Sequence, residues 1–220
     1  MINFDRLYDY RFRNVDQSSR QRVWNVIAED IYLRMGCPEV VLDPAAGRCE
    51  FMNAIPAKER WVIDRVHQDG YRDPGIAVII ANVFDAELPA SHFEGVFVSN
   101  FLEHLDSPAA VAALLSKLNV AMQSGGRIAV MGPNFKYCAR EYFDCADHVL
   151  AMSHIAVEEH LYAAGFIIDA TLPRYLPFSF RGILPPSPTL TRAYLNAPLA
   201  RHLLGKQFLI VATKPASEGL

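Results

Sequence analysis

Polar side chains that could do chemistry recur at one kind of position in this sequence, directly after a short apolar run. A carboxylate at such a position can accept two hydrogen bonds from neighbouring hydroxyl groups, or it can attract a cationic group. An amide or a hydroxyl can hold the polar end of the same ligand. These positions are Asp43 after Val40–Leu42, Asp64 after Trp61–Ile63, and Ser99 with Asn100 after Gly95–Val98.

The turn that follows Asp43 is built from small residues, Ala45, Ala46 and Gly47, and a helix is expected from Glu50. Small residues let the backbone approach a ligand closely, and the first turn of a helix offers free N–H groups. In a nicotinamide dinucleotide site the glycine-rich turn follows its strand at once, because the pyrophosphate lies there. An acid ahead of the turn disfavours phosphate and favours a cationic ligand.

The stretch from Val41 to Cys49 resembles the first motif of the class I S-adenosylmethionine-dependent methyltransferases, an acid followed by alternating glycines. Gly47 matches the central glycine of that motif, whereas Ala45 and Cys49 stand where the family usually has glycine. A subset of bacterial members is similar here, with Cys-Glu-Phe after the turn, as in residues 49–51 of this chain.

This resemblance implies a cofactor, S-adenosyl-L-methionine, with S-adenosyl-L-homocysteine as its product. Asp64 would bind both ribose hydroxyls, and Asp85, or Val83 and Phe84 beside it, would lie near the adenine. Ser99 and Asn100 would contact the methionine end, and Arg11 or Arg13 would pair with its carboxylate. The full set implied for the cofactor is Asp43, Ala45, Gly47, Cys49, Phe51, Asp64, Arg65, Val83, Phe84, Asp85, Ser99, Asn100, Phe101 and Arg11.

Candidate catalytic groups lie further along the chain, where this fold commonly forms the acceptor pocket. His148 beside Asp147, and His154, are candidate general bases, since an imidazole with a pKa near neutrality suits deprotonation of a hydroxyl. Glu103 and His104 would lie at the lip of the substrate cleft. For all of these residues a structural hydrogen-bonding role is the more common alternative. Because no His, Cys or acid spacing is typical of a metal site, no metal is predicted.

The elements that must position these residues alternate between apolar runs and helical patterns. Such alternation is typical of a doubly wound α/β fold, here a mostly parallel seven-stranded sheet with helices on both faces (Rossmann-like). In such sheets ligands bind at the carboxyl ends of the strands, near the point where strand order reverses. The expected strands are 40–42, 61–63, 77–80, 95–98, 127–131, 166–170 and 208–213, the fifth entered through the turn 124–126.

Helices are expected at 16–35, 50–55, 107–122 and 155–164. The chain, residues 1–220, is expected to form a single domain in which residues 1–36 form an N-terminal helical lid over the cofactor. Six prolines between residues 172 and 206 forbid a long helix or a central strand there. That segment is expected to be an ordered insertion between strands six and seven, with a short helix near residues 190–195.

Bulk properties narrow the function classes. The formal net charge is −3, which does not favour a nucleic-acid backbone as partner. We expect neither a secretion signal nor a membrane span, and the four cysteines lack CxxC spacing and are expected to be reduced, as in a cytoplasmic protein.

The leading hypothesis is methyl transfer to a small-molecule, saccharide or lipid-linked acceptor, on oxygen. The chain reads Ser-Asn-Phe-Leu at 99–102, and this lack of an Asn-Pro-Pro-Tyr type motif argues against the amino-methylating nucleic-acid enzymes. Two alternatives remain. The chain could be a non-catalytic cofactor- or protein-binding module on the same fold, or, less favoured, a nicotinamide oxidoreductase. The oligomeric state is not determined by the sequence.

Overall fold

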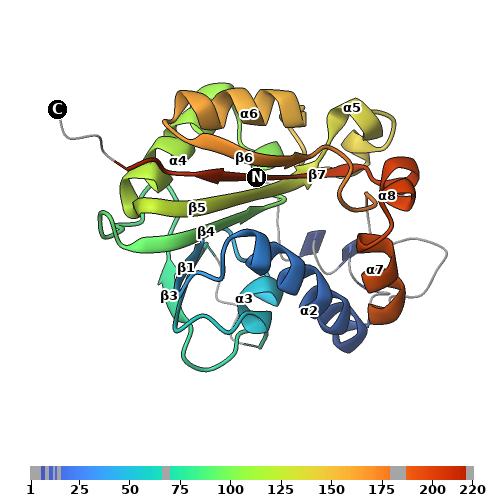
Figure 1. The fold of residues 1–220 in the computed structure, drawn as a ribbon, viewed down its shortest axis with the longest axis horizontal. Helices are drawn as coiled ribbons and strands as arrows, with labels where there is room; N and C mark the ends of the chain where they lie inside the picture. The colour runs from blue at the N-terminus through green and yellow to red at the C-terminus, as the bar shows by residue number, and fades with distance from the viewer. Residues whose placement is uncertain are drawn as a thin grey trace.

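The protein is a three-layer α/β structure in which one twisted sheet separates two layers of helices (Figure 1). The computed structural model describes residues 6–7, 10–11, 13, 16–65, 70–178 and 187–216. The helices are α2 Gln17–Arg34, α3 Glu50–Ala54, α4 Pro108–Ala121, α5 Phe135–Cys138, α6 His154–Ala163, α7 Pro188–Leu195 and α8 Pro198–Leu204, with short 3₁₀ turns η1 Leu102–His104 and η2 Tyr142–Asp144. The strands are β1 Val40–Asp43, β2 Glu59–Asp64, β3 Ala77–Ile80, β4 Phe93–Ser99, β5 Met122–Pro133, β6 Ile167–Leu172 and β7 Gln207–Thr213.

The seven strands form one sheet in the order β3-β2-β1-β4-β5-β7-β6. Pairing is parallel from β3 through β5, and β7 runs antiparallel to both β5 and β6. The chain moves outward from β1 to β3 and then returns to place β4 on the other side of β1. Strand order therefore reverses between β1 and β4. The predicted fold class, a doubly wound and mostly parallel seven-stranded sheet, is confirmed.

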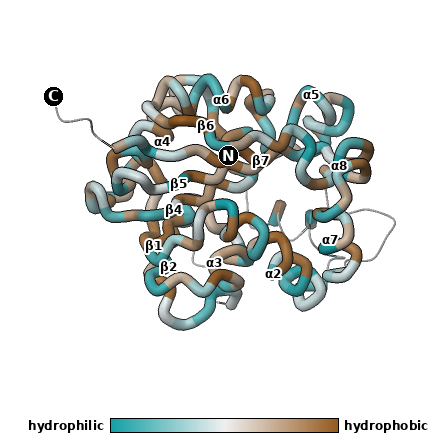
Figure 2. The backbone as a smooth tube through the Cα atoms, viewed as in Figure 1, coloured by the Kyte–Doolittle hydropathy of each residue, from teal (hydrophilic) through white to brown (hydrophobic). Residues whose placement is uncertain are grey.

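Two apolar cores cover the two faces of the sheet. On one face α2, α3 and α7 pack against inward-facing residues such as Val41 and Phe97. On the other face α4 and α6 pack against residues such as Leu42 and Val96, the neighbours of the first pair along their strands. Successive residues of a strand point to opposite faces, so runs that are apolar throughout are required when both faces are covered. Figure 2 shows this hydrophobic character along the central strands and the helices beside them.

Local signals fix the helix starts close to their expected positions. The side chain of Asp16 accepts a hydrogen bond from the Ser19 N–H at 2.8 Å and caps α2. Ser107 caps α4 in the same way through the Ala110 N–H, and Pro108 occupies the first turn, where it needs no N–H partner.

The structure departs from the sequence predictions mainly in short elements and in β5. The strand β5 begins at Met122 rather than at Arg127, because Phe93 pairs with Met122 while Gly95 pairs with Arg127. The predicted turn at 124–126 is therefore a bulge within the strand, with Gly125 at φ +81°. The short elements α5, α8, η1 and η2 were not predicted, because pieces of three to seven residues carry little periodicity.

The segment 172–206 lies between β6 and β7 and contains α7 and α8; its residues 179–186 fall outside the described part of the chain. The same holds for residues 1–5, 8–9, 12 and 14–15 of the predicted N-terminal lid. Within the described ranges, none of the helices has the length and apolar character needed to cross a membrane.

Candidate functional site

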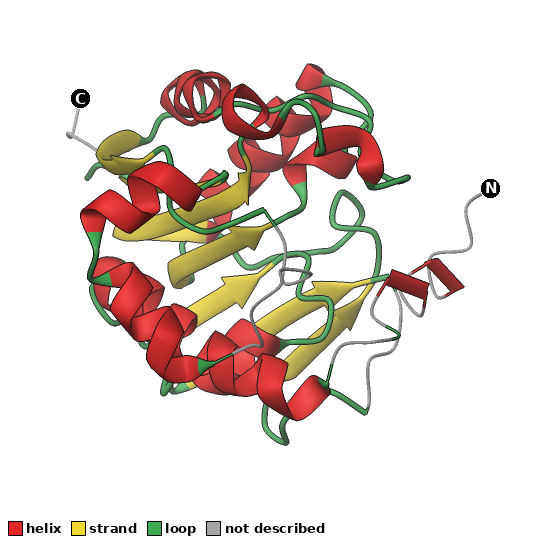
Figure 3. Cartoon of the chain, turned by 90° about the vertical axis from the view of Figure 1, so that its right-hand side faces the viewer, coloured by secondary structure: helices red, strands yellow, loops and turns green. Residues whose placement is uncertain are grey.

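The predicted site residues lie mainly at one edge of the sheet, where the parallel strands end. In Figure 3 the arrows of the parallel strands point toward this edge, and the described fragments of the N-terminal segment lie beyond it. Asp43 ends β1, Asp64 ends β2, and Asn100 follows β4. These three strands are neighbours in the sheet, so residues far apart in sequence meet at the point of strand-order reversal.

Asp43 is the buried acid of this edge, with 3% of its surface exposed. Its Oδ1 accepts a hydrogen bond from the Ala45 N–H at 3.0 Å. Burial raises the pKa of Asp43 to about 7, the charges of Asp64 and Glu50 add to the rise, and the Ala45 hydrogen bond opposes it. A cationic group placed beside Asp43 would lower that pKa and stabilise the carboxylate.

Gly47 and Asp64 shape the turn between β1 and α3. The Gly47 N–H donates to Asp64 Oδ2 at 3.0 Å, which ties the turn to the end of β2. Gly47 has φ +50°, and a methyl group built on its Cα would meet no atom within 4 Å. The backbone is therefore exposed to an open space beside a half-buried carboxylate. This is a suitable arrangement for a ligand that carries hydroxyl groups.

Cys49 and Phe51, which the sequence predicts at the cofactor, both lie in the core. Cys49 adopts the left-handed conformation (φ +57°) at the start of α3, and 2% of its surface is exposed. Phe51 packs against Phe97 with ring centroids 4.1 Å apart. Both side chains belong to the core that α2 and α3 cover. The bulk of the Cys49 side chain thus lies within this core, and burial raises the pKa of its thiol to about 12.

The α2 helix secures this turn from the side. Arg20 forms an ion pair with Glu50, and the Gln21 side-chain amide donates to the Glu50 carbonyl at 3.0 Å. These contacts fix the start of α3.

Ser99, Asn100 and Phe101 carry the chain across the same edge after β4. Asn100 is exposed, has φ +47°, and its side-chain amide donates to Ser99 Oγ at 2.9 Å. Its backbone N–H donates to the Met131 carbonyl at 2.8 Å, which anchors the turn to β5. A non-glycine residue in this left-handed region costs on the order of 1 kcal/mol, a kind of strain that is common at functional turns.

The predicted adenine neighbours follow β3. Val83 is buried, whereas Phe84 and Asp85 are exposed, and Arg65 is exposed at the end of β2. The Asn82 side chain accepts from the Phe84 N–H at 3.1 Å and shapes this turn. The predicted cofactor site therefore has the ends of β1 and β2 at its centre and the turns after β3 and β4 on either side.

A second cluster joins η1 to the loop after η2. His104 Nδ1 lies 2.8 Å from the Asp147 carbonyl oxygen and 3.6 Å from its carboxylate. Nε2 of His104 and Nε2 of His148 each lie 4.0 Å from Glu103 Oε1. One donor atom from each of Glu103, His104 and His148 lies within 4.8 Å of the others, so these residues could hold a metal ion.

Burial is the largest single influence on the pKa of each of Glu103, His148 and Asp147. It raises the pKa of Glu103, with His104 and Arg11 opposing the rise. It lowers the pKa of His148 to about 4, helped by the charge of His104. Burial alone would raise the pKa of Asp147, but its hydrogen bond to Arg11 and the charges of His104 and Arg11 outweigh this, and the pKa is lowered.

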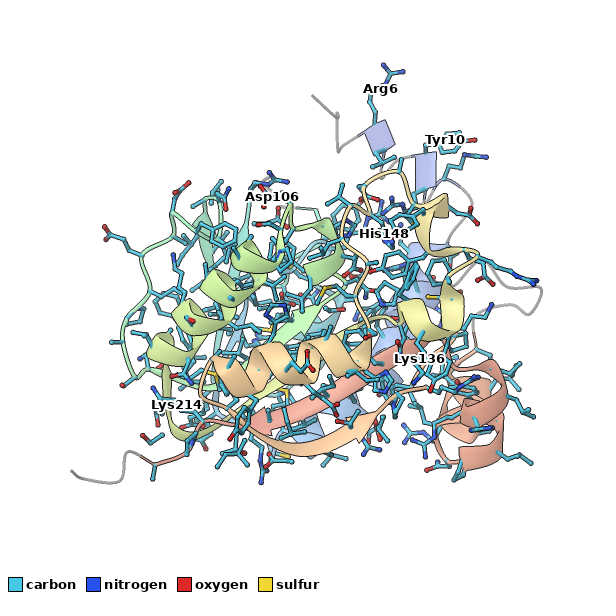
Figure 4. The ribbon with its side chains drawn as sticks, turned by 90° about the horizontal axis from the view of Figure 1, so that it is seen from above. Arg6, Tyr10, Asp106, Lys136, His148 and Lys214 are labelled. Carbon is cyan, nitrogen blue, oxygen red and sulfur yellow. The ribbon has the colours of Figure 1, made fainter. Side chains whose placement is uncertain are left out.

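Arg11 reaches this second cluster. Its guanidinium forms an ion pair with Asp147, although the sequence predicts that it pairs with the cofactor carboxylate. Figure 4 shows His148 on the side of the molecule from which the fragment carrying Tyr10 projects. Tyr8, Asp9 and Phe12 of the same predicted lid lie outside the described residues.

His154 lies apart from His104 and His148, at the first turn of α6. Its Nδ1 is hydrogen-bonded to the Asn134 side-chain amide at 2.9 Å, and its ring stacks on Tyr137. Burial lowers the pKa of His154. Asn134 also donates to the Pro173 carbonyl, so this group ties α6 to the start of the insertion.

The sequence places Glu103 near the site but gives no sign that it faces His148. The two residues are 45 positions apart (148 − 103), and neither belongs to a motif with metal-ligand spacing. Their approach depends on the loop after η2, whose Val149 and Leu150 N–H groups both donate to the Glu103 carbonyl. A backbone contact of this kind leaves no pattern in the sequence.

Neither a protein-family description nor any curated protein matches the sequence. Solved structures do match. A SAM-dependent methyltransferase from Archaeoglobus fulgidus superimposes with a TM-score of 0.68 at 18% identity, covering 96% of this chain and 100% of that one. A chain from the complex between the Haloferax volcanii Trm112 methyltransferase activator and its candidate methyltransferase gives a TM-score of 0.70 at 15% identity, covering 98% and 99%.

A third similar structure is the [4+2]-cyclase SpnF, with a TM-score of 0.62 at 13% identity, covering 88% of this chain and 81% of that one. At these identities the likeness establishes the fold. The chain has the Rossmann-like fold of SAM-dependent methyltransferases over nearly its full length. Because one similar structure is a cyclase, the reaction must be argued from the site.

Proposed function

We propose that this protein is an S-adenosyl-L-methionine-dependent methyltransferase that binds its cofactor between the ends of β1, β2 and β4. The observation that carries the proposal is the pair of carboxylates, Asp43 and Asp64, on either side of the open turn at Gly47. Asp43 is buried where a cationic methionine portion would lie, and Asp64 stands where it can accept from the ribose hydroxyls. The methyltransferase fold of the similar structures supports this choice.

The remaining cofactor contacts follow from the same placement. The turn with Ser99 and Asn100 closes the methionine side, and the turn with Phe84 and Asp85 closes the adenine side. The bulk of Cys49 lies in the core, which leaves the ligand side of the turn free although glycine is absent at that position. The cofactor supplies an electrophilic methyl group on a sulfonium sulfur and becomes S-adenosyl-L-homocysteine after transfer.

We propose oxygen of a small-molecule, saccharide or lipid-linked molecule as the acceptor. A lone pair of this oxygen forms the new bond to carbon as the carbon–sulfur bond breaks, and the electron pair of that bond remains on sulfur. The acceptor proton must leave to a base, for which His104, His148 and His154 are the candidates. The protein aligns the two reactants and excludes water. Of the predicted lid at residues 1–36, we propose this role only for the part ahead of α2, supported by the contact of Arg11 with Asp147. The α2 helix itself packs in the core against the sheet.

Calorimetric titration of the purified protein with S-adenosylmethionine tests the proposal. The protein is first stripped of carried-over ligand by partial unfolding and refolding, and binding is compared with that of NADH. We expect saturable heat and a thermal shift with S-adenosylmethionine or S-adenosylhomocysteine, and neither with NADH. Absence of heat and of any thermal shift with both nucleosides would refute the cofactor assignment.

The alternative is a non-catalytic module on the same fold, and the departures at Ala45 and Cys49 are the observations that favour it. A non-catalytic module would either bind the cofactor or not bind it, and in neither case would it transfer the methyl group. A methyl-labelled cofactor, incubated with extracts fractionated into polar metabolites, saccharides and lipids, distinguishes the two. Label that moves to one fraction with wild-type protein, and not with Asp64→Ala, supports the enzyme.

A further inference from the structure

We propose that Glu103, His104 and His148 form a binding site for a divalent first-row transition-metal ion, of which zinc is the simplest representative. Two imidazoles and one carboxylate are a donor set that zinc and ferrous iron accept in proteins, with coordination positions left open for water or substrate. The three donor atoms lie within 4.8 Å of one another.

The tautomer of His104 supports the proposal. Its Nδ1 lies 2.8 Å from the Asp147 carbonyl oxygen, and a carbonyl can only accept, so the proton resides on Nδ1. The lone pair of the neutral ring is then on Nε2, the atom that faces Glu103 Oε1 at 4.0 Å. A metal-binding histidine typically donates its other N–H to a carbonyl or a carboxylate in this way.

Glu103 supplies the second observation. Its side chain is 2% exposed, and among the described residues its Oε1 has no hydrogen-bond partner. An unpartnered carboxylate oxygen in the interior is costly, since an isolated buried charge loses its hydration. A cation placed between Oε1 and the two Nε2 atoms would satisfy it. Because both nitrogens lie 4.0 Å away, neither one forms a hydrogen bond with it directly.

The backbone holds the two halves of the site together. Val149 and Leu150 donate their N–H groups to the Glu103 carbonyl at 2.9 and 3.1 Å, which fixes the His148 loop against η1. The His104 and His148 rings meet edge to face with centroids 5.0 Å apart. A four-coordinate zinc ion with bonds of about 2.1 Å would hold its donor atoms about 3.4 Å apart, so a small inward movement completes the site.

The local charges permit a cation. The charge of the Arg11 guanidinium acts on both Glu103 and Asp147, and it forms an ion pair with Asp147. With neutral imidazoles, the two carboxylates and one guanidinium leave one net negative charge. A net negative charge in a buried cluster attracts a cation, and the Asp147 carboxylate offsets the charge of Arg11.

The position of the site assigns a role to the ion. Its ligands on η1 begin two residues after Phe101, at the edge where the cofactor turn lies. An ion held there would bind the acceptor oxygen and lower the pKa of its hydroxyl. The hydroxyl proton would pass to solvent, and an oxygen lone pair would form the bond to the methyl carbon as the carbon–sulfur bond breaks. This role rests on the proposed function, whereas metal binding itself does not. His104 and His148 would then be ligands rather than general bases.

The test is a titration of the tag-free, chelator-treated protein with Co²⁺ in place of zinc, followed by visible absorption, and with Zn²⁺ followed by calorimetry. We expect one equivalent of each ion, with cobalt absorption typical of four or five nitrogen and oxygen ligands. Glu103→Gln and His148→Phe each remove a proposed ligand and should weaken binding by at least about tenfold, the lower end of the loss seen when only an outer-shell partner of a ligand is mutated.

Two matched variants control the measurement. His92→Phe removes another histidine that faces a carboxylate, Glu59 at 3.4 Å. Within the described part of the chain, this pair belongs to no group of three candidate ligands. Cys37→Ser removes an exposed thiol that could bind the ions adventitiously. Both variants should bind like the wild type. Wild-type protein that takes up no cobalt overturns the proposal without any variant, as does folded His148→Phe that binds with unchanged affinity. Either result leaves S-adenosylmethionine binding, the readout of the proposed function, unaffected.

Discussion

Asp43→Asn should stabilise the ligand-free protein at high pH and weaken cofactor binding. The native pKa of Asp43 is about 7, against 3.8 for the ordinary side chain. Between these values the folded protein holds a proton that the unfolded chain has released, so the free energy of unfolding falls as pH rises. The penalty is complete above the folded pKa and absent below pH 3.8. A difference of about three pKa units corresponds to about 4 kcal/mol.

An experiment near neutral pH can isolate only a part of this effect on the free energy of unfolding. From pH 6 to pH 8 this group alone should lower the free energy of unfolding by about 1.4 kcal/mol, because over those two pH units the folded protein holds on average about half a proton more than the unfolded chain. Asparagine keeps the shape and can accept the Ala45 hydrogen bond, but it carries no charge to bury. The stability of Asp43→Asn relative to wild type should therefore rise by that amount over the same interval.

Cofactor binding should show the opposite dependence. If the carboxylate form pairs with the cationic end of the ligand, wild-type affinity should increase up to about tenfold from pH 6 to pH 8, following the ionised fraction of a group with a pKa near 7. Asp43→Asn should bind more weakly at pH 8 and should lack this part of the pH dependence.

Urea unfolding at pH 6, 7 and 8, together with calorimetry in the presence and absence of S-adenosylhomocysteine, measures both effects. Taking the difference between wild type and variant removes the contributions of other titrating groups. Equal slopes of stability against pH for the two proteins would refute the inference that a buried, partly protonated Asp43 carries the charge of the site.

Three further outcomes are expected. Asp64→Ala should weaken cofactor binding by about 1–3 kcal/mol, the range for hydrogen bonds to a charged group. Glu159→Ala, which removes an exposed acid on α6, should leave the affinity unchanged. Equal affinities of the two variants in calorimetry would show that Asp64 is misassigned. Gly47→Ala, at φ +50° with open space at its Cβ, should cost about 1 kcal/mol of stability and weaken the cofactor more than that; unchanged affinity would place the ligand elsewhere. Ser107→Ala should cost about 1 kcal/mol in urea unfolding, because the Ala110 N–H loses its cap, and a loss near zero would contradict this role.

Much of the fold was predictable because its signals are local. Apolar runs with acids at their ends gave the expected strands at 40–42 and 61–63, which the structure extends to β1 and β2. The predicted helix starts at residues 16 and 107 agree with the observed caps, Asp16 and Ser107. In contrast, the bulge in β5 depends on which residue of β4 lies opposite, and that register is set by packing.

The sequence by itself determined the cofactor side of the candidate site. Asp43, Gly47 and Asp64 each stand at a strand end or in the turn beside one, and parallel strands bring their carboxyl ends to one edge wherever the chain forms such a sheet. Their meeting therefore follows from spacing and residue type.

Only the tertiary structure decided the arrangement of the second cluster of polar residues. Glu103, His104 and His148 meet because the loop after η2 donates two backbone N–H groups to the Glu103 carbonyl, and because Asp147 turns His104 by a hydrogen bond to its Nδ1. The direction of Cys49, into the core rather than toward a ligand, was likewise decided by its left-handed backbone and the packing beneath it. Such features depend on backbone geometry and on partners distant in the chain, which residue types at fixed spacing do not encode.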